Sequence, residues 1–504
     1  MGANVSTQPE LPAKASTKKQ SEVFNEKMGY FDLNQHLRGL SLDVGNYENT
    51  DKNPISTESL DTWETKLLAD PKNVLAQNAF AKNAIVDVIG TSNSETLSKD
   101  KYLFNVEVET IGSPSYFNNQ NASGRCWIFA TSNILRTHVI KRYNLKPDHF
   151  QVSQSYLFFY DKLEKANFFL DNIIDTTEEP LDSRLIQYLF QAPVSDGGQW
   201  DMIVNLVTKY GIVPHELFPD SAQASASSRL NYIVTEKLRE FALILRGLLT
   251  DEATSEQDIK TVKQSMMKEI YNIIALSLGT PPKPTDSFTW EFIDKDGTFK
   301  SFETNPIDFY KTHVKFDAAK HFSLIHDPRN PYEKLYTVDR LNNISNGKPI
   351  EYVNLELSVI KKTAIKMLKK NEPIFFGSDV GKFSNSQSGI LDTGAYDYEL
   401  GFGTSLKINK EERLRTGSSQ MTHAMVITGV HLDKAGVPVR WKIENSWGDA
   451  VGEKGYFLMT DAWFDEYVFQ IVTNEKFVDP KTFNIWTKKE YSVLPFFDPM
   501  GALA

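Results

Sequence analysis

The one cysteine of this 504-residue chain, Cys126, stands where a polar loop containing Gly124 runs into a helical pattern. A thiol in the first turn of a helix faces unpaired backbone N–H groups and the positive end of the helix dipole, which favour the thiolate. Gln120 lies on the preceding loop, where its side-chain amide can point at the same place. A nucleophile beside an N–H donor is half of an acyl-transfer site, although a small buried residue is the commoner role of a lone cysteine.

A cysteine nucleophile needs a base, and His423 is the candidate among nine histidines. It stands near the start of a predicted strand, and Asn445 and Trp447 follow at the end of the next one. An asparagine oxygen can accept the second imidazole N–H and so orient the ring, while a tryptophan beside that bond would shield it from water. A strand histidine alone is more often structural. The joint occurrence of Cys126, His423 and Asn445 is what indicates catalysis.

The elements that would position these side chains follow from the spacing of apolar residues. Residues 127–142 contain neither Gly nor Pro and repeat apolar residues at helical spacing, which predicts a buried helix directly after the thiol. Strands are predicted at 102–108, 290–293, 352–355, 373–378, 421–431, 440–445 and 455–460, so the last third is β-rich, whereas the rest of 288–355 reads as irregular. Helical stretches are predicted at 57–68, 76–88, 161–171 and 202–210.

A pair of glycines, Gly197 and Gly198, opens the helical pattern that stops at Gly211. Paired glycines let a backbone adopt positive φ and let another chain approach closely. This suits the rim of a peptide-binding site, but a plain turn would have the same composition.

Two long amphipathic helices are predicted at 227–250 and 255–278, and they suggest a helical insertion. The expected buried stripes are Leu230, Ile233, Leu238, Phe241 and Leu245 on the first helix, and Ile259, Val262, Met266, Ile270, Ile273 and Leu276 on the second.

Composition excludes several classes of protein. The net charge of −10 (55 basic against 65 acidic residues) argues against a nucleic-acid-binding protein, which needs a basic face. One cysteine rules out an intramolecular disulfide and fits a reducing compartment, and no apolar run is long enough to span a membrane. No His or Cys pair has the spacing of metal ligands, so we expect neither metal nor cofactor. A cytosolic location is predicted.

The N-terminus matches the pattern Met-Gly-x-x-x-Ser for N-myristoylation of Gly2, although such patterns also arise by chance. A single acyl chain binds membranes only marginally, and Lys14, Lys18 and Lys19 could assist on an anionic surface. Membrane association is therefore expected only if Gly2 carries the lipid.

Three motifs carry a family resemblance. Gln120-x-x-x-Gly124-x-Cys126-Trp127-x-x-Ala130, Thr422-His423-Ala424 and Asn445-Ser446-Trp447-Gly448 resemble, in this order, the active-site blocks of papain-like cysteine peptidases. Five segments resemble the bleomycin hydrolase family in particular: residues 123–127, 421–425, 156–167, 196–198 and the tail 498–504.

The resemblance implies an α+β, papain-like fold, in which a helical domain carries the cysteine and a barrel-like β domain carries histidine and asparagine. It implies a cytosolic homohexamer and an aminopeptidase of broad specificity for peptides with a free N-terminus, acting also on bleomycin and homocysteine thiolactone. A nucleic-acid-binding ring with secondary peptidase activity is the alternative. Carried over, Cys126 is the nucleophile, His423 the base, Asn445 its orienter and Gln120 an oxyanion donor. Gly197, Gly198, Trp447 and the terminal carboxylate of Ala504 would meet the substrate.

The expected domain organisation follows from these assignments. Residues 1–50 form an N-terminal arm, 51–219 the helical half with the cysteine and 220–290 the helical insertion. Residues 291–490 form the β-rich half, and 491–504 a tail that reaches the active site.

Overall fold

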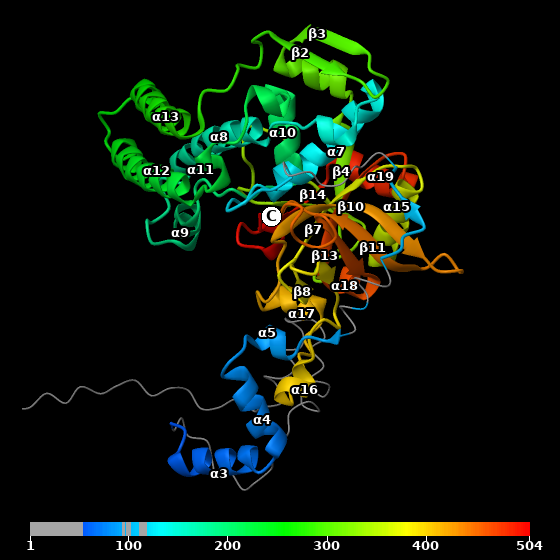
Figure 1. The fold of residues 1–504 in the computed structure, drawn as a ribbon. Helices are drawn as coiled ribbons and strands as arrows, with labels where there is room; N and C mark the ends of the chain where they lie inside the picture. The colour runs from blue at the N-terminus through cyan, green and yellow to red at the C-terminus, as the bar shows by residue number, and fades with distance from the viewer. Residues whose placement is uncertain (1–53, 93–95, 97–101, 110–117, 504) are drawn as a thin grey trace, which may run out of the picture. The chain divides into compact units, whose positions relative to one another are not determined.

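The computed structural model describes residues 54–92, 96, 102–109 and 118–503, and it contains two compact units (Figure 1). The smaller unit comprises Met1–Ile89 with Tyr398–Glu412, and the larger comprises Gly90–Asp397 with Arg413–Ala504. The predicted boundaries at 219, 290 and 490 all fall inside the larger unit, so those domain limits stay a prediction. The arm at 1–50 lies outside the described residues.

The smaller unit is built from short helices: α3 (Thr57–Leu68), α4 (Pro71–Phe80), α5 (Ile85–Val88) and α16 (Tyr398–Phe402). Helix α3 has the predicted bounds, and the Phe80 and Phe402 rings stack 4.7 Å apart. The single helix predicted at 76–88 is wrong, because the chain leaves the helix between α4 and α5. There the Asn83 amide donates to the Ala79 carbonyl, a local bond that competes with helix continuation.

Helices of the larger unit carry the first half of the site: α7 (Cys126–Tyr143), α8 (Gln154–Asp175), α9 (Arg184–Gln191), α10 (Trp200–Tyr210), α12 (Ser228–Leu249) and α13 (Glu256–Leu278). Helix α8 starts earlier than predicted because the Ser153 hydroxyl caps it, accepting the Tyr156 N–H. Helix α10 ends at Gly211, where φ is +70° and a Cβ would overlap the Pro306 backbone.

The two insertion helices, α12 and α13, pack on α8 and on each other. Their buried stripes differ from the predicted ones at the edges. Ile233 is 49% exposed and Leu276 is 89% exposed, whereas Val234, Ile274 and Leu278 are buried. A helix turns by about 100° per residue, so a stripe placed one or two positions out of phase puts its outer members in solvent.

Twelve strands of the larger unit form one sheet, in the order β14-β5-β6-β4-β13-β7-β10-β11-β12-β9-β8, with β1 paired to β10. Strands 7, 10, 11 and 12 match predicted strands, whereas β1 is shorter than predicted. The strands predicted at 290–293 and 352–355 are present as β2 and β6, but the region between them is not irregular as predicted, since it holds β3, β4 and β5. The strands are β1 (Val106–Glu107), β2 (Phe288–Ile293), β3 (Phe299–Thr304), β4 (His321–Ile325), β5 (Lys334–Val338), β6 (Tyr352–Asn354), β7 (Ile374–Ser378), β8 (Ser384–Asn385), β9 (Ile390–Leu391), β10 (His423–Leu432), β11 (Pro438–Glu444), β12 (Tyr456–Thr460), β13 (Val468–Asn474) and β14 (Tyr491–Leu494).

Shorter helical elements complete the chain: η1 (Pro147–His149), η2 (His215–Leu217), α11 (Ala222–Ser225), α14 (Pro306–Asp308), η3 (Phe309–Val314), η4 (Ala318–Lys320), α15 (Leu357–Leu368), α17 (Lys410–Arg415), α18 (Asp461–Tyr467), α19 (Pro480–Lys488) and η5 (Pro499–Gly501).

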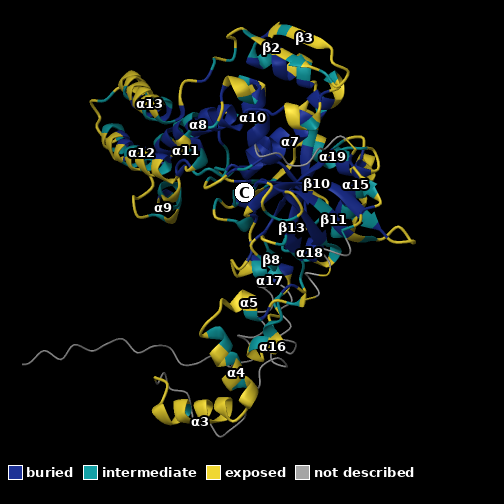
Figure 2. Ribbon diagram, viewed as in Figure 1, coloured by how far each residue is buried: buried dark blue, intermediate teal, exposed yellow. Residues whose placement is uncertain are grey.

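The core of the larger unit lies between the helices and the sheet. Helix α7 packs on β10, and almost all of α7 and the central strands is buried (Figure 2). One apolar cluster joins Trp127 and Ile134 of α7 to Val426 of β10, and a second covers the sheet beside α15 and α18. The α+β class is confirmed. The packing of α7 on β10 places the start of the helix next to the start of the strand.

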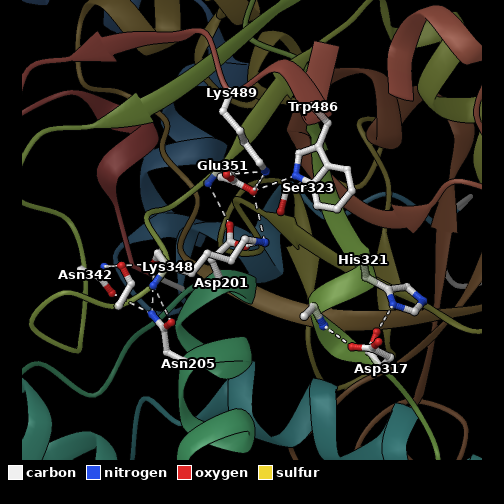
Figure 3. A network of polar contacts seen from close by, with 12 residues as sticks. Asp201, Asn205, Asp317, His321, Ser323, Asn342, Lys348, Glu351, Trp486 and Lys489 are labelled. Carbon is white, nitrogen blue, oxygen red and sulfur yellow. Dashed lines mark hydrogen bonds and ion pairs between the residues drawn. The ribbon is translucent and has the colours of Figure 1, made fainter. Parts of the chain in front are cut away.

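A network of charged side chains around the buried Asp201 and Glu351 connects α10 to the loop before β6 and to the end of α19 (Figure 3). We call Asp201, Lys348, Glu351 and Lys489 the sheet cluster. Lys348 pairs with Asp201 at 2.6 Å and with Glu351 at 3.2 Å, and Lys489 pairs with Glu351 at 2.7 Å. Trp486 Nε1 also donates to Glu351 at 2.7 Å.

Candidate active site

Cys126 is the first residue of α7, as predicted, and the loop before it is tied to the segment after β11. The Gln120 N–H donates to the Ser446 carbonyl at 2.9 Å, and Asn119 forms an antiparallel bridge with Trp447. The Asn118 side chain donates to the Asn445 carbonyl at 2.8 Å. Two segments more than three hundred residues apart in sequence therefore lie side by side at the cysteine.

His423 and Asn445 are brought together as the sequence predicted. His423 opens β10, Asn445 directly follows β11, and His423 Nε2 lies 2.8 Å from Asn445 Oδ1. An amide oxygen can only accept, so Nε2 carries the proton and Nδ1 is the basic nitrogen. Both residues are buried, and the Trp447 ring lies 4.9 Å from the imidazole. The expected asparagine orienter and tryptophan shield are in contact with the ring.

The Cys126 sulfur lies beside β10, within hydrogen-bond reach of the backbone N–H of Ala424, the residue after His423. Burial raises the pKa of the Cys126 thiol to about 11, although the N–H groups of Ala424, Trp127 and Cys126 itself act to lower it. The N–H groups at the helix start act in the expected direction, toward the thiolate, but the loss of hydration on burial outweighs them. Burial likewise lowers the pKa of His423 to about 4. Burial therefore opposes a charge on either group alone.

The Gln120 side chain is held firmly beside the cysteine loop. Its Nε2 donates to the Ser123 carbonyl at 2.6 Å, and its Oε1 accepts from the Ser446 hydroxyl at 2.7 Å. An amide nitrogen has two hydrogens, so one N–H beyond the Ser123 bond is left for a ligand. This is compatible with the predicted oxyanion donor.

Gly197 and Gly198 lie next to the cysteine helix, but positive φ does not explain why glycine stands at these positions. Neither is among the glycines with positive φ in the described residues. A Cβ on Gly198 would instead overlap the Trp127 ring, and a Cβ on Gly124 would come within 2.8 Å of the Asp196 Cβ. Close approach between the cysteine loop and the 195–198 segment is what requires glycine here.

The C-terminal tail is held against the same segment. Gln199 Nε2 donates to the Ala502 carbonyl at 2.6 Å, and Met500 is buried. Arg329 pairs with Asp498 at 2.8 Å. Residues 501–503 line a pocket of about 380 Å³ with Ser195 and Gln420. Ala504 and Gly2 lie outside the described residues, so their predicted roles stay predictions.

Sequence reasoning missed a second buried charge cluster, Asp161, Lys162, Lys165 and Asp196, which we call the loop cluster. Lys162 pairs with Asp196 at 2.6 Å and Lys165 with Asp161 at 2.7 Å, and all four side chains are less than 10% exposed. Three of them lie on one face of α8 at spacings of three and four residues. That spacing was the available signal, but it is also typical of a solvated helix face.

Two features are absent from the part of the chain that the structure describes, a cluster of metal ligands and a membrane-spanning helix. No group of three or more His, Cys, Asp or Glu residues there could hold a metal ion. Among the same residues, no helix has the length and apolar character needed to cross a bilayer.

Comparisons with known proteins agree with this geometry. The sequence profile described as the Peptidase C1-like family matches residues 54–501. The chain is 42% identical over 460 residues to the bleomycin hydrolases of Rattus norvegicus and Homo sapiens, covering 89% of this chain and 99% of each of those. It is 40% identical to cysteine proteinase 1, mitochondrial, of Saccharomyces cerevisiae, over 89% of this chain and 93% of that protein. Among solved structures, PepW from Lactobacillus rhamnosis is similar with a TM-score of 0.85 and 41% identity, covering 90% of this chain and 99% of that one.

Proposed function

The chain belongs to the Peptidase C1-like family and is a cysteine peptidase of the bleomycin hydrolase type, and from this premise we propose that it is an aminopeptidase of broad specificity. Its fold is the expected papain-like α+β fold. The proposed substrates are peptides with a free N-terminus, and bleomycin amides and homocysteine thiolactone are further proposed substrates. The site residues take the roles that their sequence motifs imply.

The observation that carries the proposal is the hydrogen bond between His423 and Asn445 beside Cys126. With Nε2–H held by Asn445 at 2.8 Å, Nδ1 is free of a proton and can accept that of the thiol. Both side chains are buried, so opposite charges formed on the two groups at once would stabilise each other. Proton transfer therefore creates a thiolate–imidazolium pair that neither group would form alone.

The reaction then follows in two steps. The Cys126 thiolate attacks the scissile carbonyl carbon, and the Cys126 backbone N–H and the free N–H of Gln120 stabilise the oxyanion. The His423 imidazolium gives its proton to the leaving amine, and a thioester remains. Water, activated by His423, hydrolyses the thioester and restores the thiol.

We propose that the C-terminal tail restricts cleavage to the amino ends of peptides. The Gln199–Ala502 bond and the buried Met500 support a tail that is packed up to residue 502, next to the segment of Gly197 and Gly198. The carboxylate of Ala504, two residues further on, would then pair with the free amine of the substrate and block longer chains.

Two substrates that differ only in the N-terminal amine test the specificity. An aminoacyl-aminomethylcoumarin should be cleaved, whereas its N-acetylated counterpart should not. A chain lacking the last three residues should cleave acetylated and internal peptide bonds. Equal cleavage of free and acetylated substrates by the full chain would contradict the aminopeptidase assignment, and an unchanged product pattern after truncation would contradict the role of the tail.

We also propose a homohexameric assembly in the cytoplasm, with a membrane-bound pool only if Gly2 is myristoylated. The net charge of −10 supports a ring that does not depend on nucleic acid. The yeast relative is named mitochondrial, so location needs its own experiment. Light scattering of the purified protein tests the assembly, and fractionation of cells expressing the chain or its Gly2→Ala variant tests the location.

A further inference from the structure

The segment between α9 and α10 has neither helix nor strand at residues 192–199, yet buried cations bind its backbone. Lys165 Nζ donates to the Ser195 carbonyl at 2.9 Å and to the Gly197 carbonyl at 2.6 Å. Lys162 Nζ donates to the Val194 carbonyl. Ammonium donors form short, strong bonds, so these contacts hold the carbonyl side of the segment more firmly than neutral donors would.

The remaining carbonyl of this run and the side chain of Asp196 connect the segment to the cysteine. Trp127 Nε1, one residue after the nucleophile, donates to the Asp196 carbonyl at 2.7 Å. The Asp196 carboxylate accepts the Gly124 N–H of the cysteine loop at 3.0 Å and pairs with Lys162. It also accepts from Ser227 and Asn231. The four carbonyls of residues 194–197 are therefore all bound from the side of α7 and α8.

The N–H groups of the same segment are not used in this way. Within the described ranges, no residue accepts a hydrogen bond from the backbone N–H groups of residues 195–198. With the four carbonyls already bound, the N–H groups of the segment are the backbone groups that can still donate to the carbonyls of a bound peptide.

The charges of the loop cluster balance, two cations against two anions, but the arrangement is costly. Burial lowers the pKa of Lys162 and raises that of Asp161, which shows how much hydration both lose. Buried ion pairs often stabilise a fold less than apolar residues of the same size would. A role in positioning accounts for these charges better than stability does.

We propose that Lys162 and Lys165, paired with Asp196 and Asp161 and aided by Trp127, are positioning residues that hold segment 194–198 in register with the Cys126 loop for substrate binding. The proposal rests on the proposed peptidase function. It assigns these residues to binding of the substrate backbone, and leaves the chemistry to Cys126 and His423.

The test removes one pair without leaving a buried charge. In the double variant Lys165→Met/Asp161→Asn, asparagine keeps an oxygen for the Asn343 amide that Asp161 accepts at 3.0 Å. We expect kcat/KM on an aminoacyl-aminomethylcoumarin to fall about 100-fold, mainly through KM, because a displaced rim misplaces the substrate. Alkylation of Cys126 by iodoacetamide should keep the wild-type rate, because it needs no peptide-binding rim. Amide hydrogen exchange should rise at residues 194–198.

Lys209→Met is the matched control. Lys209 pairs at 2.5 Å with Glu164 of α8, the helix that carries Lys162 and Lys165, but the Lys209 side chain is 52% exposed and does not contact the segment. It should keep wild-type KM and exchange. An unchanged KM and unchanged exchange in a folded double variant would overturn the proposal, as would an equal loss of alkylation and peptide turnover.

If the double variant does not fold, Trp127→Phe is the second test, since it keeps every charge of the loop cluster and removes the donor to the Asp196 carbonyl together with part of the ring that packs on Gly198. A raised KM with normal alkylation then supports the proposal, and an unchanged KM overturns it. Absence of cleavage by the wild-type protein would refute the proposed function instead, and hydrogen exchange would still report on the positioning.

Discussion

Two clusters of charged side chains lie on either side of one short stretch, five residues apart at Asp196 and Asp201. The loop cluster is wholly buried, whereas the sheet cluster surrounds two buried carboxylates with lysines that are partly exposed. In the sheet cluster the lysines bind carboxylates, so that Glu351 joins a loop to the end of α19 (Figure 3). In the loop cluster the lysines bind carboxylates and backbone carbonyls together. The first arrangement ties the short loop before β6 to the helices α10 and α19, whereas the second binds the backbone carbonyls of a segment that has no regular structure of its own.

The difference indicates why charged side chains are buried beside an active site. Strands and helices satisfy their own backbone groups, but an irregular segment needs donors from elsewhere. This chain has a single cysteine and cannot fix its cysteine loop by a disulfide, and hydrogen bonds to Asp196 and Trp127 connect the loop and the segment instead. Loss of the loop cluster should thus change substrate binding, and loss of the sheet cluster should change stability.

The largest expected effect is on turnover, and it distinguishes the catalytic step from the substrate binding and stability assigned to the two clusters. Cys126→Ala removes the nucleophile and should lower kcat by about 10⁶-fold, the scale seen when a covalent nucleophile is lost. Both clusters remain, so the variant should still bind peptide and should unfold at the wild-type temperature. Turnover by stopped assay and binding by calorimetry with the same peptide measure the two effects. Comparable turnover in the variant would remove Cys126 from the mechanism, and His149→Ala, on the short η1 turn, serves as a control for substitution alone.

Gln120→Ala should lower kcat by about 10²- to 10³-fold, since one of two oxyanion donors is lost. The effect should lie in kcat, in contrast to the KM effect expected of the loop cluster, because the oxyanion forms only after attack. Steady-state kinetics on one substrate distinguish them. Gln187→Ala is a matched control, because its amide donates to the Leu181 carbonyl at an exposed position. A rise in KM alone would place Gln120 in substrate binding.

Sequence reasoning located the reacting groups but not their supports. Cys126, His423 and Asn445 were predictable because their motifs fix residue types that chemistry requires, and because strong apolar spacing located α7, β10 and β11. Lys162 and Lys165 were not, since charges three residues apart on a helix usually face water. Only the tertiary fold brings segment 194–198 against that face. The strands β3 to β5 were missed for a related reason, because short apolar runs do not distinguish strand from loop until a partner strand is known.

A third prediction tests the sheet cluster directly. Glu351→Gln removes the carboxylate that Lys489 pairs with and one of the two that Lys348 pairs with, and should lower the free energy of unfolding by about 3 kcal/mol. The kcat/KM of the folded variant should remain at the wild-type value, because Glu351 does not contact the 194–198 segment. Urea unfolding and initial rates are the measurements. Glu333→Gln is the control, since its pair with Lys481 is largely exposed and should contribute little. A raised KM in Glu351→Gln would erase the distinction between the two clusters.

The smallest effect concerns pH, at His321, which opens β4 beside the sheet cluster. Burial lowers the pKa of His321 to about 4; Asp317 acts to raise it, and Lys476 and Lys348 act to lower it further. The folded state then binds fewer protons than the unfolded state between pH 6.5 and 4, so stability is full above pH 6.5 and falls as the pH falls toward 4.

His321→Phe should keep the stack on Phe316, whose ring lies 4.4 Å away, and remove this titration. The loss of unfolding free energy between pH 7 and pH 4 should shrink by about 2 kcal/mol, less than the full shift would give because His321 is not wholly buried. A difference in unfolding free energy that stays constant above pH 7 measures the loss of the hydrogen bonds to the Asp317 carbonyl and the Asn474 amide. It serves as the internal control. His423 keeps its own acid sensitivity in the variant, since its pKa is also about 4. A pH dependence identical to wild type would show that His321 is not held neutral by burial, while a change in KM at pH 7 would show that this side of the sheet reaches the substrate after all.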